Sequence, residues 1–152
     1  MLKKPENKTR KRLRITQCIL FLAEILFCTF TFVQIPNPDS TKLGFFATVF
    51  DMLGYLGGNF PEGAQGEAFC SVLPLFFVFL VIPIVGFFFC ALDKERNLKN
   101  IVSIICCLLG VFSILTIVSI NFISYGSLLA LLFYLLISFI TAFAMMARLT
   151  ND

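Results

Sequence analysis

The strongest constraint on this chain is a series of apolar runs long enough to cross a lipid bilayer. Four such spans are expected, at about residues 15–35, 69–92, 101–122 and 128–147. A helix of about twenty residues reaches the ~30 Å thickness of a bilayer's hydrocarbon core. Hydrophobic residues make up 59% of the chain and charged residues only 14%, whereas soluble domains average about a quarter charged. The sequence therefore predicts an all-α integral membrane protein, a four-helix bundle.

The chain is expected to form one transmembrane domain, residues 15–147. It is preceded by a basic tail, residues 1–14, and followed by a short polar end, residues 148–152. The first apolar run is longer than the apolar core of a signal peptide, and no small-residue cleavage pattern follows it before Pro36. We therefore interpret this run as a retained first helix.

The first outer loop, residues 36–68, is predicted to contain an amphipathic helix lying in the membrane interface. Residues 43–56 are largely apolar but too short to span. Wound as a helix, this segment places Gly44, Thr48, Asp51 and Tyr55 along one face. A polar strip against a broad apolar face is typical of an interfacial helix. A re-entrant segment tucked among the spans is the alternative.

The distribution of basic residues predicts the orientation. Eleven of the twelve Lys and Arg residues lie in the N-terminal tail, in the link between the second and third spans, or just after the fourth. The outer loop holds only Lys42, together with four acidic residues. Because Lys and Arg are retained on the cytoplasmic side, a multi-pass protein with both termini in the cytoplasm is expected.

Glu24 is the one ionisable residue near the middle of a predicted span. Gln17, Glu24 and Thr31 are spaced by seven residues, so a helix would place them on one face, the candidate intramembrane polar site. Two interpretations stay open. Glu24 is either a neutral carboxyl that hydrogen-bonds a serine, a threonine or the backbone, or part of a proton or cation path.

The remaining candidate residues concern helix packing rather than chemistry. Cys106, Gly110 and Ser113 form a strip of small residues on the third span, which allows close approach of another helix. The chain has no histidine, and its six cysteines form no C-x-x-C pair. We therefore expect no catalytic constellation, no metal site and no cofactor.

These features favour a small polytopic membrane protein that acts as a non-catalytic accessory or scaffold subunit. The alternative is a small transporter or channel subunit that uses Glu24 as a proton or cation site, and a membrane enzyme ranks last. The expected partners are the lipid bilayer and either a second copy or another membrane protein. No nucleic acid partner is expected.

Overall fold

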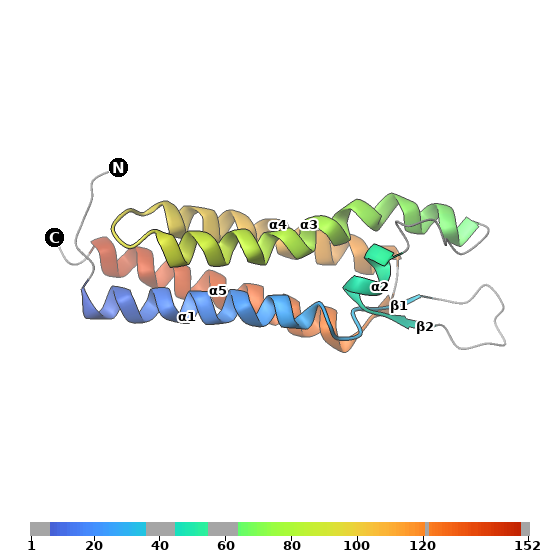
Figure 1. Cartoon of the computed structure of the whole chain (residues 1–152), viewed down its shortest axis with the longest axis horizontal. Helices are drawn as coiled ribbons and strands as arrows, with labels where there is room; N and C mark the ends of the chain where they lie inside the picture. The colour runs from blue at the N-terminus through green and yellow to red at the C-terminus, as the bar shows by residue number, and fades with distance from the viewer. Residues whose placement is uncertain (1–6, 36–44, 55–63, 121, 150–152) are drawn as a thin grey trace.

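The computed structural model describes residues 7–35, 45–54, 64–120 and 122–149, and the chain is predominantly helical. Four long helices are present in these ranges: α1 (Lys8–Phe27), α3 (Ala64–Leu92), α4 (Leu98–Ile120) and α5 (Tyr125–Leu149). One short helix, α2 (Val49–Gly54), and three short strands, β1 (Val33–Ile35), β2 (Phe45–Ala47) and β3 (Phe122–Ile123), complete the described structure (Figure 1).

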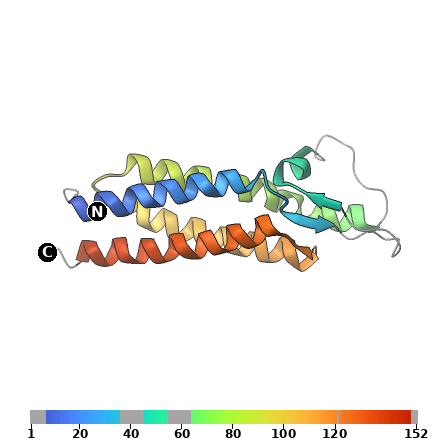
Figure 2. The same ribbon diagram turned by 90° about the horizontal axis from the view of Figure 1, so that it is seen from below.

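Each long helix packs against two others. Helix α3 contacts α1 and α4, and α5 contacts the same two helices from the other side (Figures 1 and 2). Three helices within the described ranges are long and apolar enough to cross a membrane: Leu73–Leu92, Leu98–Ser119 and Tyr125–Leu149, with mean hydropathies of 2.9, 2.9 and 2.5. The chain therefore has the architecture of a multi-pass, all-α membrane protein.

The prediction of a continuous first helix over residues 15–35 is wrong at its outer end. Helix α1 stops at Phe27, where the Cys28 N–H donates to the Ile25 carbonyl and the Thr29 N–H to the Leu26 carbonyl, and Val33–Ile35 forms strand β1. Residues 29–33, Thr-Phe-Thr-Phe-Val, are all β-branched or aromatic, and such residues favour extended backbone. Pairing with two other strands then stabilises the extended conformation over a continued helix.

The same helix begins earlier than predicted. Asn7 is the N-cap, and its side-chain oxygen accepts a hydrogen bond from the Arg10 N–H at 2.9 Å. Residues 8–14 of the predicted tail therefore belong to α1, and residues 1–6 lie outside the described ranges.

The other three spans are each longer than predicted at their N-terminal ends. Helix α3 begins at Ala64 instead of 69, α4 at Leu98 instead of 101, and α5 at Tyr125 instead of 128. Hydrogen bonds to side chains near the N-terminal ends of α4 and α5 explain the last two starts. The Asp93 carboxylate accepts from the Arg96 and Lys99 N–H groups, and Ser127 Oγ accepts from the Ser124 N–H.

The three strands form one small antiparallel sheet in the order β2-β1-β3. Val33 pairs with both Ala47 and Ile123, so the sheet joins the segment after α1 to the outer loop and to the α4–α5 turn. The predicted interfacial helix over residues 43–56 is therefore wrong for Phe45–Ala47. Of the described residues 45–54, only Val49–Gly54 is helical, and the predicted strip residues Gly44 and Tyr55 lie outside the described ranges.

A capping box starts the short helix α2. The Asp51 carboxylate accepts hydrogen bonds from the Thr48 N–H at 3.0 Å and the Thr48 hydroxyl at 2.8 Å, and Thr48 Oγ1 accepts from the Asp51 N–H at 3.1 Å. Thr48 and Asp51 thus share a face, as predicted, but they bond each other at a helix start.

We expect this start of α2 to loosen at low pH. The donors of Thr48 hold the pKa of the Asp51 carboxyl below its usual range. A lowered pKa stabilises the folded form above the carboxyl's unfolded pKa, and this contribution is lost as pH falls through the folded pKa. A carboxyl NMR titration should show a lower midpoint in the wild type than in Thr48→Val, whereas Thr48→Ser should retain it. Equal midpoints in all three would contradict the capping role.

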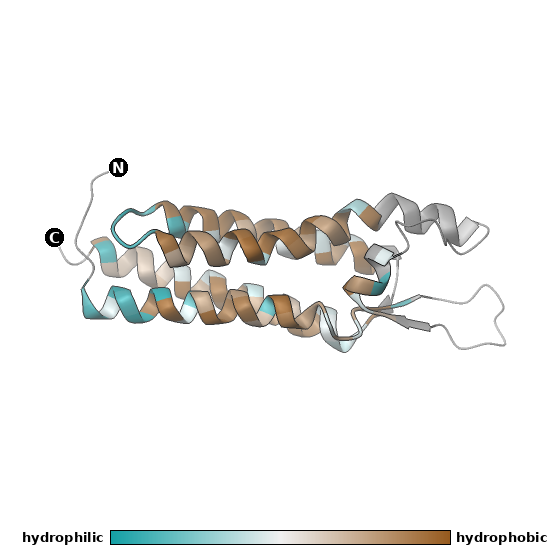
Figure 3. Cartoon of the chain, in the orientation of Figure 1, coloured by the Kyte–Doolittle hydropathy of each residue, from teal (hydrophilic) through white to brown (hydrophobic). Residues whose placement is uncertain are grey.

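The two ends of the helical assembly differ in polarity (Figure 3). The hydrophilic residues gather where α1 begins, where α3 joins α4 and where α5 ends (Figure 3). We call this the basic end, after Arg10, Arg14, Lys94, Lys99 and Arg148. The opposite end, which carries the sheet, is called the sheet end.

Candidate functional site

Gln17 and Glu24 lie on the inner face of α1. Both are completely buried, at 0% exposure. The opposite face of the same helix exposes four apolar side chains at helical spacing: Ile15, Ile19, Leu22 and Leu26. A helix that buries its polar side chains and exposes its apolar ones is suited to a lipid environment.

Gln17 is held by helix α5. Its Nε2 donates to Thr141 Oγ1 at 2.8 Å, and the Thr141 hydroxyl donates in turn to the Ile137 carbonyl at 2.7 Å. Gln17 Oε1 is buried without a hydrogen-bond partner. The contact fixes the register between α1 and α5, with one acceptor left over.

Glu24 has no equivalent contact. Both of its carboxyl oxygens are buried, and neither has a hydrogen-bond partner in the part of the chain that the structure describes. The hydroxyls of Ser138 and Thr141 bond backbone carbonyls of their own helix, and so does that of Thr116. Among the described residues, the hydrogen bond required by the first of the two interpretations, from Glu24 to a serine, a threonine or the backbone, is therefore not formed.

The register between α1 and α5 places Glu24 level with Tyr134. The two helices are antiparallel (Figure 1), so two turns beyond Gln17 on α1 correspond to two turns before Thr141 on α5. A charge on Glu24 acts electrostatically on Tyr134, on Cys28 and on Cys107 of α4. The carboxyl thus lies within electrostatic range of one phenol and two thiols.

Tyr134 occupies the centre of the four helices. It is fully buried, its ring packs edge-on against Phe79 with centroids 5.9 Å apart, and its hydroxyl has no hydrogen-bond partner. Gly110 of α4 makes room for the ring, because a Cβ at that position would lie 2.6 Å from ring atoms of Tyr134. Two polar groups without a partner, the Glu24 carboxyl and the Tyr134 hydroxyl, therefore lie at the same depth.

Thr31 does not belong to this site. It lies beyond the end of α1 and is exposed. Its carbonyl accepts from the Gly126 N–H at 2.9 Å, and Ser124 Oγ donates to its hydroxyl at 3.3 Å. Gly126 is required here, since a Cβ would lie 2.6 Å from the Thr31 carbonyl oxygen. Placing Thr31 with Glu24 was wrong because the seven-residue spacing holds only while the helix continues.

The predicted packing strip of α4 faces inward. Cys106, Gly110 and Ser113 are all buried, and Gly110 contacts the Tyr134 ring. Cys107 is also buried, so two consecutive cysteines pack into the helix contacts. Of these positions, Gly110 contacts the candidate site.

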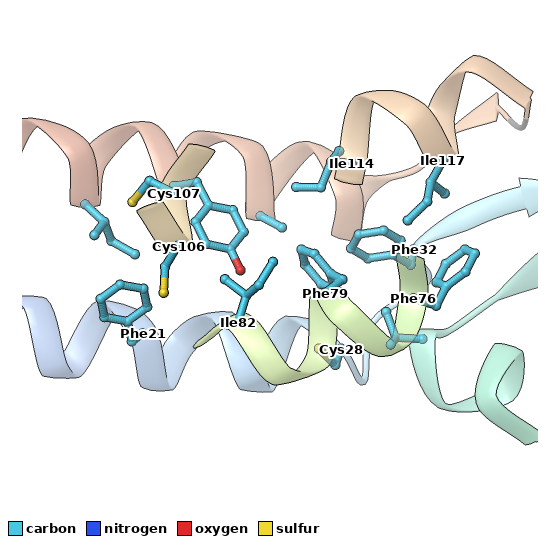
Figure 4. Packing of buried hydrophobic residues seen from close by; sticks show 14 of the residues in the cluster. Phe21, Cys28, Phe32, Phe76, Phe79, Ile82, Cys106, Cys107, Ile114 and Ile117 are labelled. Carbon is cyan, nitrogen blue, oxygen red and sulfur yellow. The ribbon is translucent and has the colours of Figure 1, made fainter. Parts of the chain in front are cut away.

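The surroundings of Glu24 differ on its two sides. Toward the sheet end, the core consists of large apolar side chains: Phe32, Phe76, Phe79, Ile114 and Ile117 (Figure 4). Three serines are buried on that side: Ser113, and Ser124 and Ser127, which bond each other at the start of α5. Toward the basic end, buried polar side chains recur: Gln17, Lys99, Asn100, Ser103 and Thr141.

The basic end is built from side chains that bond backbone carbonyls. Arg14 Nη1 donates to the Cys90 and Ala91 carbonyls at 3.3 Å, at the C-terminal end of α3. Lys99 Nζ donates to the Asp93 and Lys94 carbonyls at 3.0 and 3.4 Å. Cations at helix C-termini satisfy carbonyls that lack partners within the helix.

Tyr134 was missed as a site residue in the sequence analysis. The available signal was its seven-residue spacing from Thr141, which matches that of Gln17 and Glu24. Among the described residues, no group of three metal-ligating side chains is found. Comparison with protein-family models, with curated proteins and with solved structures gives no match.

Proposed function

We propose that this chain is a four-span integral membrane protein with both termini in the cytoplasm, acting as a non-catalytic accessory or scaffold subunit. The observation that carries the fourth span is the exposed apolar stripe of α1. Leu26 is 58% exposed and Ile19 is 62% exposed, while Gln17 and Glu24 on the other face are fully buried. In a bilayer, the exposed apolar side chains contact lipid while the polar side chains pack against the other helices.

The length of α1 supports the same proposal. Its apolar part, from Ile15 to Phe27, extends about 20 Å. In the two turns before it, Lys8, Lys11 and Arg12 are exposed, and such long side chains can reach the headgroup region from the edge of the hydrocarbon core. Beyond Phe27, the exposed Phe30 continues the apolar surface toward the sheet end.

The proposed orientation follows from the basic end. Arg10, Lys99 and Arg148 come from three different segments and gather at one end of the molecule. A reporter fused after Asp152 is therefore expected to be active only in a cytoplasmic format, and one inserted at Gly63 only in an external format. The reverse pattern, or activity of both fusions on one side, would contradict the four-span topology.

The accessory role is supported by what the charged side chains do. Arg14, Asp93 and Lys99 bond helix-end backbone groups, and Asp51 caps α2. These contacts build the fold and do not converge on a common reacting centre. The Glu24→Gln variant tests this role. If the protein is an accessory subunit, the variant should fold and retain the activity that the wild type supports in cells.

A small transporter or channel subunit is the second candidate function. The specific observation in its favour is that both carboxyl oxygens of Glu24 are buried without a partner. An intramembrane carboxyl that serves packing is expected to have a partner, whereas one that takes up and releases a cation need not. Flux in reconstituted vesicles that stops with Glu24→Gln would favour this candidate, and unchanged flux would exclude it.

A further inference from the structure

The buried polar groups near Glu24 are unevenly placed along the helices, and this gives the site a direction. We infer that Glu24 and Tyr134 form a proton-binding pair that exchanges with the basic end of the molecule and is closed toward the sheet end. This inference shares Glu24 with the second candidate function, but it concerns binding and exchange and does not require net transport.

The pair itself rests on position and on missing partners. Glu24 and Tyr134 lie level on antiparallel α1 and α5, both are completely buried, and neither the carboxyl nor the phenol hydroxyl has a hydrogen-bond partner. Buried polar groups without partners are rare in native proteins and call for an explanation. Because they lie at the same depth, a small side-chain movement could let the phenol hydroxyl donate to the carboxyl.

The chemistry is a single proton transfer. The neutral Glu24 carboxyl releases one proton to water that enters from the basic end, and the Tyr134 hydroxyl then donates a hydrogen bond to the carboxylate left behind. Rebinding reverses both steps, so no other reactant is needed. A phenol donor offsets part of the large free-energy cost of a buried charge.

The titration of Glu24 depends on the titratable and charged groups around it. Cys28 on its own helix, Cys107 on α4 and Tyr134 on α5 interact with it electrostatically. The nearest basic residue on α1 is Arg14, whose guanidinium bonds carbonyls of α3 near the basic end. Because Glu24 exchanges a single proton, its uptake or release changes the net charge at this depth by one unit.

The route to the basic end is marked by buried polar side chains. Gln17 and Thr141 lie two turns nearer that end, and Gln17 Oε1 has no partner. Ser103 and Asn100 of α4 continue the polar lining, and Asn100 Oδ1 also has no partner. These oxygens are acceptors that transient water molecules can bridge.

The opposite route is blocked by the aromatic cluster of Phe32, Phe76 and Phe79. All three are fully buried, and the Phe32 and Phe79 ring centroids are 4.7 Å apart (Figure 4). Phe79 also contacts the Tyr134 ring, so the cluster begins directly beside the site. Close-packed rings offer water neither volume nor hydrogen bonds.

Infrared difference spectroscopy of the full-length protein in lipid tests the inference. A protonated-carboxyl band assigned by its loss in Glu24→Gln should disappear reversibly as pH rises and should shift on transfer to D₂O. Gln17→Leu should slow the D₂O shift roughly tenfold, about the factor for raising the barrier by one hydrogen bond. Ser113→Ala, which removes a buried hydroxyl on the sheet side, should leave the rate unchanged.

Three results would overturn the inference. The first is a Glu24 band that neither titrates nor shifts in D₂O, which describes a sealed structural carboxyl. The second is the absence of any band that Glu24→Gln removes. The third is slowing by Ser113→Ala without slowing by Gln17→Leu, which places access at the sheet end. A band that titrates as expected in a protein without flux would leave the inference intact and exclude the transporter candidate.

Discussion

Replacing Tyr134 by alanine is expected to destabilise the protein by about 2–3 kcal/mol, whereas replacing it by phenylalanine should cost nothing. The ring is fully buried between Gly110 and Phe79, so its removal leaves a void. A cavity term of about 24 cal/mol per Å³ over roughly 100 Å³ gives this magnitude. The hydroxyl has no partner, so Tyr134→Phe removes no hydrogen bond and relieves an unsatisfied buried group.

Unfolding of the purified protein in mixed micelles with increasing denaturing detergent measures both effects. Gly110→Ala supplies an independent check, because its Cβ would overlap the Tyr134 ring and should destabilise the wild type. The same change in a Tyr134→Ala background should cost much less, since the ring is gone. Gly54→Ala is the matched control, because no atom lies within 4 Å of its added Cβ. Additive effects of the Gly110 and Tyr134 changes would contradict the contact.

The Glu24→Met variant is expected to be more stable than the wild type, by about 1–3 kcal/mol. Methionine has a similar length and flexibility, and it replaces a buried carboxyl whose two oxygens have no partner. No hydrogen bond is lost in exchange. If a packing contact held the carboxyl, Glu24→Met would instead lower the free energy of unfolding. The same detergent-induced unfolding measures this change.

Gln17→Met is the matched control for this substitution, two turns away on the same face of α1. It removes the hydrogen bond to Thr141 together with the unpartnered Oε1, so its stability should change by about 0.6–1 kcal/mol less favourably than that of Glu24→Met. Equal destabilisation by both variants would show that Glu24 is held by a contact of its own. A Glu24→Met protein that is more stable but inactive would show that Glu24 serves function at a cost in stability. Higher stability with full activity would match the accessory role.

The inward position of Glu24 was predictable because it follows from helix periodicity. Gln17 and Glu24 are seven residues apart, and both side chains lie on the buried face of α1. Their surroundings were not predictable in the same way. Whether Glu24 meets Thr141 or Tyr134 depends on the register of α1 against α5, which is set by contacts between residues more than a hundred positions apart.

The end of α1 illustrates the same limit for the fold. Residues 28–35 continue the apolar run of the helix, so composition and length favour continuing the span. The pairing of Val33 with Ala47 and with Ile123 converts this segment into the central strand of a sheet. β-Propensity depends on such cross-strand partners, and these come from elsewhere in the chain.

By itself, the sequence determined the class of this protein, because an apolar run of spanning length forces the backbone to satisfy its own hydrogen bonds as a helix. It also predicted that the nine Lys and Arg residues of the described ranges gather at one end, since they flank the apolar runs. Only the tertiary structure decided that α1 yields to a strand beyond Phe27 and that Tyr134 lies beside Glu24. Strand pairing and helix register are interactions between distant segments, and local periodicity carries no information about which segments meet.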